Sequence, residues 1–188
     1  MSKIAVFASG NGTNFEVIAK AAQNGEIDVE IVLLVCDNMN ANVISLAKKR
    51  GIDAFVFDPA SYPGKDAYEA AILAALTDRD VTFLVLAGYM RLIGKRLLEA
   101  YPMQIVNIHP SLLPLFPGKD AIRRAFESGA LKTGVSIHYV DEGMDTGQVI
   151  AQADVEIKND DTLDRLTCRV HKTEHALYVQ TLKELFQK

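Results

Sequence analysis

The chain has 188 residues, enough to bury one hydrophobic core, and its apolar content of 49% is typical of a globular protein. Its net charge of −4 argues against nucleic-acid binding, and its N-terminal segment has too few consecutive apolar residues for a signal peptide or a membrane span. The two cysteines, Cys36 and Cys168, form no CxxC pair and so predict no disulfide framework or cysteine-rich zinc site. We therefore expect a single-domain cytoplasmic protein with no nucleic-acid or membrane partner.

Apolar runs and helical patterns alternate through the first half of the chain. Strands are predicted at residues 3–9, 30–36, 54–57 and 82–86, and helices at 14–24, 42–50 and 65–77. Gly25 and Gly51 follow the first two helices and favour their termination. This alternation indicates βαβ units and a mostly parallel sheet.

The second half changes character after a fifth strand that starts at Ile105. A short helix is predicted at about 120–128, strands at 133–140 and 149–155, and a long helix at about 162–186. The loop DEGMDTGQ between the last two strands is too short for a crossover helix, so this pair is predicted to be antiparallel. The predicted fold class is α/β: a doubly wound, Rossmann-like, mostly parallel sheet with helices on both faces and an antiparallel edge.

Ligands of such sheets bind at the carboxyl ends of the strands, where the loop SGNGTN (residues 9–14) follows the first strand. Its glycines allow a tight turn, and together with the start of the next helix they also suit a monophosphate. A dinucleotide site is the rival hypothesis, because Asp37 ends the second strand. That fingerprint fails because its third glycine falls at Phe15, which leaves a structural turn and a phosphate site open.

The loop AGYMRLIG (residues 87–94) follows the fourth strand. Its apolar side chains and its single arginine, Arg91, suit a flat ligand with an anionic tail. Packing of the same residues over the core is an equally good explanation of this composition.

The stretch IVNIHPSLLP (residues 105–114) places an amide and an imidazole at the end of an apolar strand. Side chains two residues apart on a strand share a face, so Asn107 and His109 are predicted to project together, opposite Val106 and Ile108. Pro110 restricts His109 to an extended backbone. This arrangement is typical of two polar groups held for a function.

The loop at residues 141–147 contains three acidic residues, which are most often simply solvated. An imidazole that works as an acid or a base needs a carboxylate that orients it and holds its proton. Asp145, between Gly143 and Gly147, is the best candidate for that carboxylate.

The string HKTEH (residues 171–175) matches a zinc-binding pattern on a helix. Its histidines and Glu174 share a helix face, but too little chain follows for the further acidic ligand. We expect no metal site and interpret this face as a substrate contact or an ordinary helix surface.

The motifs SGNGTN, AGYMRLI, NIHPSLLP, GMDTG and TEHALY occur in this order across nearly the whole chain. Together they resemble the family of phosphoribosylglycinamide formyltransferases, the folate-dependent enzymes of purine synthesis. The resemblance implies transfer of a formyl group from 10-formyltetrahydrofolate, a co-substrate, to the amine of 5′-phosphoribosylglycinamide. It also implies a single formyltransferase domain over residues 1–188, with a phosphate-binding half (about 1–100) and a folate and catalytic half (about 101–188).

The resemblance also implies the roles of individual residues. No metal is expected, the partners are small molecules, and the chain is expected to be a monomer or a homodimer. Asp120 and Ile122 stand where certain relatives carry histidines, so an auxiliary catalytic role of that segment does not carry over. The implied catalytic residues are Asn107, His109 and Asp145; the implied ribonucleotide contacts are Gly12, Thr13, Asn14, Glu174 and His171; the implied folate contacts are Lys65, Met90, Arg91, Leu92, Ile93, Asn107 and Val140.

Other proteins share part of this pattern, because NIHPSLLP occurs in several 10-formyltetrahydrofolate enzymes. Methionyl-tRNA formyltransferases and formyltetrahydrofolate hydrolases normally carry an additional domain, for which 188 residues leave no room. A non-catalytic nucleotide-binding module that uses only residues 9–14 is the alternative outside enzymes, but it does not explain the presence of Asn107, His109 and Asp145.

Overall fold

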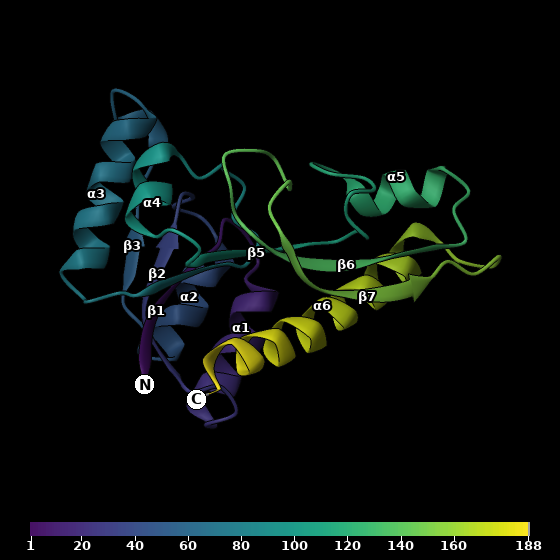
Figure 1. The fold of residues 1–188 in the computed structure, drawn as a ribbon, viewed down its shortest axis with the longest axis horizontal. Helices are drawn as coiled ribbons and strands as arrows, with labels where there is room; N and C mark the ends of the chain where they lie inside the picture. The colour runs from purple at the N-terminus through teal and green to yellow at the C-terminus, as the bar shows by residue number, and fades with distance from the viewer. Residues whose placement is uncertain (188) are drawn as a thin grey trace.

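A seven-stranded sheet runs through the computed structural model, which describes residues 1–187 (Figure 1). The strand order is β3-β2-β1-β4-β5-β6-β7, in which β1 to β5 are parallel and β6 pairs antiparallel with both β5 and β7. The predicted fold class is confirmed. The strands are β1 (Ser2–Phe7), β2 (Val29–Cys36), β3 (Ala54–Val56), β4 (Phe83–Leu86), β5 (Ile105–His109), β6 (Lys132–Tyr139) and β7 (Val149–Glu156).

All the predicted strands and helices are present, with ends within two residues of their predicted positions. Two short helices were not predicted, the 3₁₀ helix η1 (Pro59–Ser61) and the α-helix α4 (Lys95–Ala100). No helix in the described part of the chain has the length and apolar character needed to cross a membrane. The remaining helices are α1 (Thr13–Gln23), α2 (Asn42–Lys49), α3 (Lys65–Thr77), α5 (Ala121–Glu127) and α6 (Leu163–Phe186).

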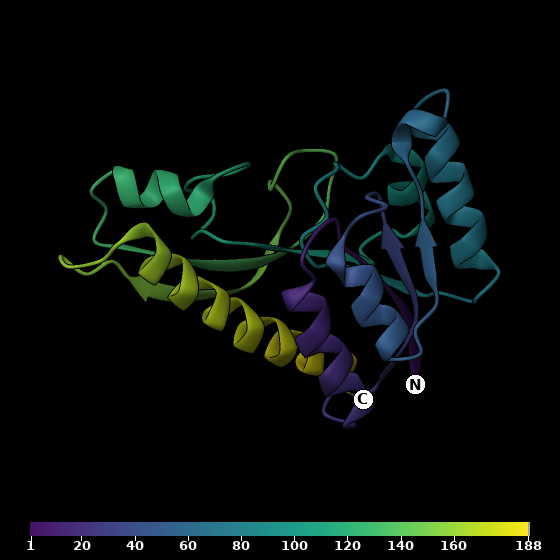
Figure 2. The ribbon, with the colours of Figure 1, turned by 180° about the vertical axis from the view of Figure 1, so that it is seen from behind.

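Alternate residues of the strands point to opposite faces of the sheet and belong to two hydrophobic cores. Val6, Val106 and Ile137 belong to the first core, into which α1, α2 and α6 pack (Figure 2). Phe7 and Leu84 belong to the second core, which α3 and α4 cover. This period-two alternation under helices on both faces explains why the strands are almost continuously apolar.

The long C-terminal helix α6 crosses the first face and packs against α1, β6 and β7. Tyr178 anchors it, because its fully buried hydroxyl donates to the Leu86 carbonyl oxygen at 2.8 Å and lies 3.3 Å from that of Val106. The helix therefore bridges the N-terminal and C-terminal parts of the sheet.

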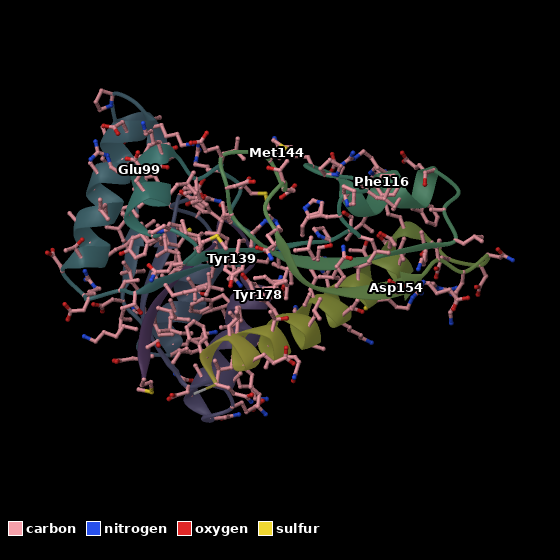
Figure 3. The ribbon with its side chains drawn as sticks, viewed as in Figure 1. Glu99, Phe116, Tyr139, Met144, Asp154 and Tyr178 are labelled. Atoms are coloured by element: carbon pink, nitrogen blue, oxygen red, sulfur yellow. The ribbon has the colours of Figure 1, made fainter. Side chains whose placement is uncertain are left out.

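On the second face, loops and not helices cover the polar side chains of β5 and β6. The loop at residues 110–120 contacts His109, and the loop at 140–148 brings Asp145 to both strands. In Figure 3, Phe116 and Met144 of these loops lie across the strands from Tyr178 and α6. Within residues 1–187 no helix buries this part of the sheet, so its polar side chains can contact the two loops.

Candidate active site

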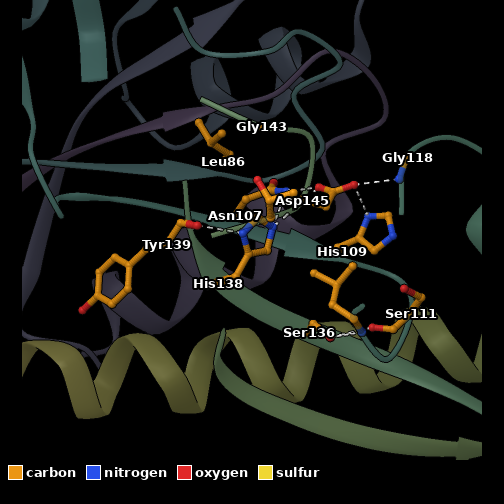
Figure 4. Close-up of polar contacts among 12 residues, drawn as sticks. Leu86, Asn107, His109, Ser111, Gly118, Ser136, His138, Tyr139, Gly143 and Asp145 are labelled. Carbon is orange, nitrogen blue, oxygen red and sulfur yellow. Dashed lines mark hydrogen bonds and ion pairs between the residues drawn. The ribbon is translucent and has the colours of Figure 1, made fainter. Parts of the chain in front are cut away.

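The alternation of β5 places Asn107 and His109 on the loop-covered face, as predicted, and sends Val106 and Ile108 into the first core. β6 pairs antiparallel with β5, so His138 stands opposite Asn107, and Ser136 opposite His109. Two imidazoles and one amide therefore line a single patch of the sheet. Figure 4 shows this group with Asp145 above it.

Asp145 lies between the two histidines and contacts each with a different carboxylate oxygen. Its Oδ2 is 3.3 Å from Nδ1 of His109, and its Oδ1 is 3.6 Å from Nε2 of His138. Oδ2 also accepts a hydrogen bond of 2.7 Å from the backbone N–H of Gly118. The structure therefore brings the predicted trio Asn107, His109 and Asp145 together.

Burial raises the pKa of the Asp145 carboxyl, but the interactions around it have the larger net effect. Hydrogen bonds from His138 and from the Gly118 N–H, together with the charge of His109, bring the pKa below its ordinary value. Asp145 is therefore a carboxylate at neutral pH and can hold a neighbouring imidazole by charge as well as by geometry.

Both ring nitrogens of His109 face oxygen atoms. Nδ1 faces Asp145, and Nε2 lies 2.9 Å from the backbone carbonyl oxygen of Phe116. Since carboxylates and carbonyls only accept hydrogen bonds, a ring that carries both protons satisfies both contacts. His109 is also 95% buried, so its orientation is fixed by these two oxygens.

His138 orients the amide of Asn107. Its Nδ1 lies 2.8 Å from the Tyr139 carbonyl oxygen, and its Nε2 lies 3.2 Å from Nδ2 of Asn107 and 3.6 Å from Oδ1 of Asp145. The same Nδ2 is 3.5 Å from Oδ1 of Asp145. One amide N–H of Asn107 is thereby directed toward the carboxylate.

The predicted phosphate loop ends at the N-terminus of α1, where the first backbone N–H groups have no partner within the helix. Gly12 has a φ of +77°, and a Cβ at this position would lie 2.6 Å from a side-chain carbon of Val43, so only glycine fits. Thr13 is exposed, whereas Asn14 is buried and its Oδ1 has no hydrogen-bond partner among the described residues. The free N–H groups at the helix N-terminus suit an anionic ligand, whereas the Asn14 oxygen suits a hydrogen-bond donor.

The loop at residues 88–94 is fastened to the phosphate loop by Asp37, the acid that suggested a dinucleotide site. Asp37 accepts from the Ser9 hydroxyl at 2.5 Å and from Nε of Arg91 at 2.6 Å, and Ser9 in turn accepts from the Met90 N–H. The Asp37 side chain is 7% exposed and is occupied by these two donors. Asp37 is therefore a connection between two loops, and the dinucleotide interpretation loses its acidic residue.

The other predicted folate contacts are less uniform than the sequence suggests. Met90 and Leu92 are exposed beside Arg91, whereas Ile93 is buried in the second core and Val140 packs against that core. Lys65 begins α3 and lies beside Gly94. The predicted folate contacts whose side chains are exposed to solvent are therefore Lys65, Met90, Arg91 and Leu92.

Glu174 of α6 is buried, and one of its oxygens lies 2.5 Å from Nδ1 of His171. The hydrogen bond to Glu174 raises the pKa of His171. Nε2 of His175 is buried without a partner in the described part of the chain, and burial lowers the pKa of this histidine. Among residues 1–187, no group of three or more His, Cys, Asp or Glu side chains is arranged to hold a metal ion.

Residues 2–182 match the sequence family described as formyl transferase. The chain belongs to the formyl transferase family. It is similar to phosphoribosylglycinamide formyltransferase of Bacillus subtilis, with 51% identity over 98% of this chain and 95% of that protein. A chloroplastic phosphoribosylglycinamide formyltransferase of Arabidopsis thaliana is 38% identical over 96% of this chain and 64% of that protein.

Solved structures agree with this assignment. The fold is similar to the crystal structure of glycinamide ribonucleotide transformylase 1 from Geobacillus kaustophilus, with a TM-score of 0.97, 52% identity and full coverage of both chains. Phosphoribosylglycinamide formyltransferase from Bacillus halodurans gives a TM-score of 0.97 and 48% identity, over all of this chain and 96% of the other. The predicted family is thus confirmed.

Sequence reasoning missed three groups of this formyl transferase site: the imidazole of His138, the N–H of Gly118 and the carbonyl of Phe116. The alternation of β6 already separated Ser136 and His138 from Val135 and Ile137. The register of β6 against β5 was the missing information, and no local signal in the sequence supplies it.

Proposed function

We propose that this formyl transferase moves the formyl group of 10-formyltetrahydrofolate to the amine of 5′-phosphoribosylglycinamide, a step of purine synthesis. The supporting observation is the group formed by Asp145, His109 and Asn107, with a carboxylate that contacts both other side chains. The high identity to phosphoribosylglycinamide formyltransferases over nearly the whole length of one of them supports this choice of substrates.

The reaction needs a donor for a developing oxyanion and a path for one proton. The amine nitrogen bonds to the formyl carbon, and the formyl oxygen becomes negative. The bond between the formyl carbon and the folate nitrogen then breaks, the amine nitrogen loses a proton, and the departing folate nitrogen gains one. We expect the N–H groups of Asn107 and His109 to donate to the oxyanion; removing one such donor typically costs about 3–4 kcal/mol of barrier. We expect Asp145 to hold His109 in place and to take part in moving the proton.

The present contacts indicate how substrate would engage His109. Its Nε2 faces the Phe116 carbonyl at 2.9 Å, and Nδ1 is held by Asp145. A substrate oxygen that takes the place of this carbonyl would receive the same N–H without any movement of the imidazole. Substrate would therefore have to displace the Phe116 carbonyl from this position.

We assign the ribonucleotide to the N-terminus of α1 and the folate to the side of the exposed loop residues. Gly12, Thr13 and Asn14 would receive the phosphate end, where unpaired N–H groups and the helix dipole favour a dianion. The unpartnered Oδ1 of Asn14 would accept from a ligand hydroxyl or amine, since a buried acceptor without a partner costs about 1–3 kcal/mol.

The remaining predicted contacts are assigned to the same ligands as in the sequence analysis. Glu174, with His171 beside it, would bind the ribonucleotide. Met90, Leu92 and Lys65 would contact the folate directly. We expect Arg91, Ile93 and Val140 to shape that pocket from behind, because Arg91 is paired with Asp37 and the other two pack on the core.

A substrate panel tests this proposal. Loss of 10-formyltetrahydrofolate is followed with phosphoribosylglycinamide, with methionyl-tRNA, and with water alone as acceptor. We expect turnover only with the ribonucleotide, and we expect His109→Ala to lose it. Equal turnover with water would instead make the protein a hydrolase, and turnover with methionyl-tRNA alone would overturn the choice of acceptor.

A further inference from the structure

Arg124 of α5 fastens the loop that contacts both His109 and Asp145. Its Nε donates to the Lys119 carbonyl oxygen at 3.0 Å, and its Nη2 donates to the Pro117 carbonyl oxygen. Its guanidinium carbon also stands 6.0 Å from the centre of the Phe116 ring. One side chain therefore holds three successive parts of the segment 116–119.

A single peptide group connects Arg124 to the site. The carbonyl of the peptide between Pro117 and Gly118 accepts from Arg124, and the N–H of the same peptide donates to Oδ2 of Asp145 at 2.7 Å. A cation at the oxygen end polarises the peptide and makes its N–H a better donor, because hydrogen bonds in a chain strengthen one another. The positive charge of Arg124 thereby strengthens the hydrogen bond from the Gly118 N–H to the carboxylate, although Arg124 does not contact Asp145.

The second connection runs through Phe116. Arg124 lies over the ring of this residue, whose carbonyl oxygen accepts from Nε2 of His109 at 2.9 Å. Because substrate would displace this carbonyl, the contact with Phe116 belongs to the protein without substrate, and the connection to Asp145 is the one that would persist during the reaction.

The loop needs such a fastening because its backbone is in an unfavourable conformation. Phe116 and Asp120 both have φ values in the left-handed region, at 51° and 55°. This region is uncommon for residues with a side chain and costs of order 1–3 kcal/mol for each one. Gly118 between them has a φ of +76°, and a Cβ there would lie 2.9 Å from the sulfur of Met144.

We propose that Arg124 is a positioning residue for formyl transfer, which acts through the Pro117–Gly118 peptide to hold Asp145, and through this carboxylate His109, in their reactive arrangement. The inference rests on the proposed function for its consequence in catalysis, but not for the contacts themselves. It also gives a role to the segment that departs from certain relatives at Asp120 and Ile122.

The test compares Arg124→Ala and Arg124→Lys with Arg123→Ala. Arg123 is the adjacent exposed arginine of α5, and its Nη1 faces Glu127 at 3.7 Å, away from the loop. The titratable side chains that face Asp145 are His109 from β5 and His138 from β6, and all three variants leave them in place. Arg123→Ala thus removes the same charge from the same helix without touching the site.

We expect Arg124→Ala to lower kcat about 10- to 100-fold with a smaller change in KM, since a shift of about 1 Å in a reacting group can cost about 100-fold. The weakened N–H donor should raise the pKa of Asp145, so the acidic limb of the kcat profile should move to higher pH. Arg124→Lys should recover part of both effects because it keeps a charged donor, and Arg123→Ala should match the unchanged protein.

A second measurement is independent of activity. The side-chain carboxyl ¹³C resonance of Asp145, identified by its absence in Asp145→Asn, is titrated in the unchanged protein and in each folded variant. A higher midpoint in Arg124→Ala alone supports the proposal even if no acceptor substrate is turned over, in which case only the proposed function fails. The proposal would be overturned if Arg124→Ala folds and has the same midpoint and pH profile as Arg123→Ala. If the alanine variant does not fold, the same result for Arg124→Lys would overturn it.

Discussion

One carboxylate organises the polar residues of this site. Asp145 has a left-handed backbone with a φ of 57°, which turns its side chain toward the sheet from a loop that otherwise faces solvent. Its two oxygens receive the Gly118 N–H and face His109, His138 and Asn107. Substitutions of Asp145 therefore change the geometry and the charge of the whole group.

Asp145→Asn should lower kcat by about 10²- to 10⁴-fold, the range typical of a lost acid–base partner. The amide has the same shape, but it has no charge to hold His109, and its NH₂ group opposes one of the donors that now face the carboxylate. Initial rates at saturating concentrations of both substrates give the change in kcat.

Asp154→Asn is the matched control for this prediction. Asp154 is an exposed residue of β7, paired with Lys132 at 2.6 Å, and Figure 3 shows it well away from Met144 of the loop that carries Asp145. It should retain the full rate. If Asp145→Asn also stayed within a few-fold of that rate, the orienting role of the carboxylate would be wrong.

The residues of the site were not equally readable from the sequence. Asn107 and His109 could be paired because they lie two positions apart on one strand, which is a local rule. Asp145 could be chosen because an imidazole needs a carboxylate and the loop offered one between glycines. His138 could not be found, because its place opposite Asn107 depends on how two strands are aligned.

At the scale of elements, α4 shows how a helix can depend on a distant residue. Its N-cap, Gly94, has no side chain to accept the free N–H groups. Glu69 of α3 takes that role, because its buried carboxylate accepts from the Gly94 N–H at 2.6 Å and is also hydrogen-bonded to the backbone of Leu97 in the first turn. The capping group of α4 thus comes from 25 residues earlier in the chain.

Glu69→Ala should lower the free energy of unfolding by about 1–3 kcal/mol, because it leaves a buried N–H donor without its partner. Glu69→Gln keeps an acceptor oxygen in nearly the same place and should cost less. Urea unfolding of both variants measures the difference, and Glu99→Ala, an exposed change on α4, is the control. Equal losses in the alanine and glutamine variants would contradict a capping role.

The stability of Glu69→Gln relative to the unchanged protein should depend on pH. Burial raises the pKa of Glu69 despite the hydrogen bond from Gly94, so the folded state keeps this proton to higher pH than the unfolded state does. The unchanged protein therefore loses stability as pH rises from the unfolded pKa through the folded one. Since Glu69→Gln cannot ionise, its stability relative to the unchanged protein should increase across that window.

The two elements that sequence reasoning missed share a physical cause. α4 has six residues and η1 has three, which is too short for a hydrophobic period to be visible. The remaining helices were visible because their apolar faces repeat over several turns, as in α6 with Leu166, Val170 and Tyr178. Elements stabilised by tertiary contacts leave little trace in the local sequence.

At the scale of the whole molecule, two hydrophobic cores lie on opposite faces of one sheet. Residues 1–100 and residues 101–187 meet where β4 pairs with β5, in the middle of that sheet. The hydroxyl of Tyr178 spans the same boundary, and α6 from the second half packs on α1 from the first. We therefore expect that neither half is stable without the other and that residues 1–188 form one domain.

A single cooperative unfolding transition should follow from this connection, even though the chain exceeds the length of about 150 residues below which two-state behaviour is usual. The chain contains no tryptophan, so Phe55→Trp in β3 and Phe126→Trp in α5 each place one reporter in a different half. Both residues are partly buried, so exposure on unfolding changes their fluorescence. The urea midpoint measured by fluorescence should coincide with that from far-ultraviolet circular dichroism in each variant. Two separated midpoints, with one reporter unfolding first in both kinds of measurement, would show that the halves fold independently.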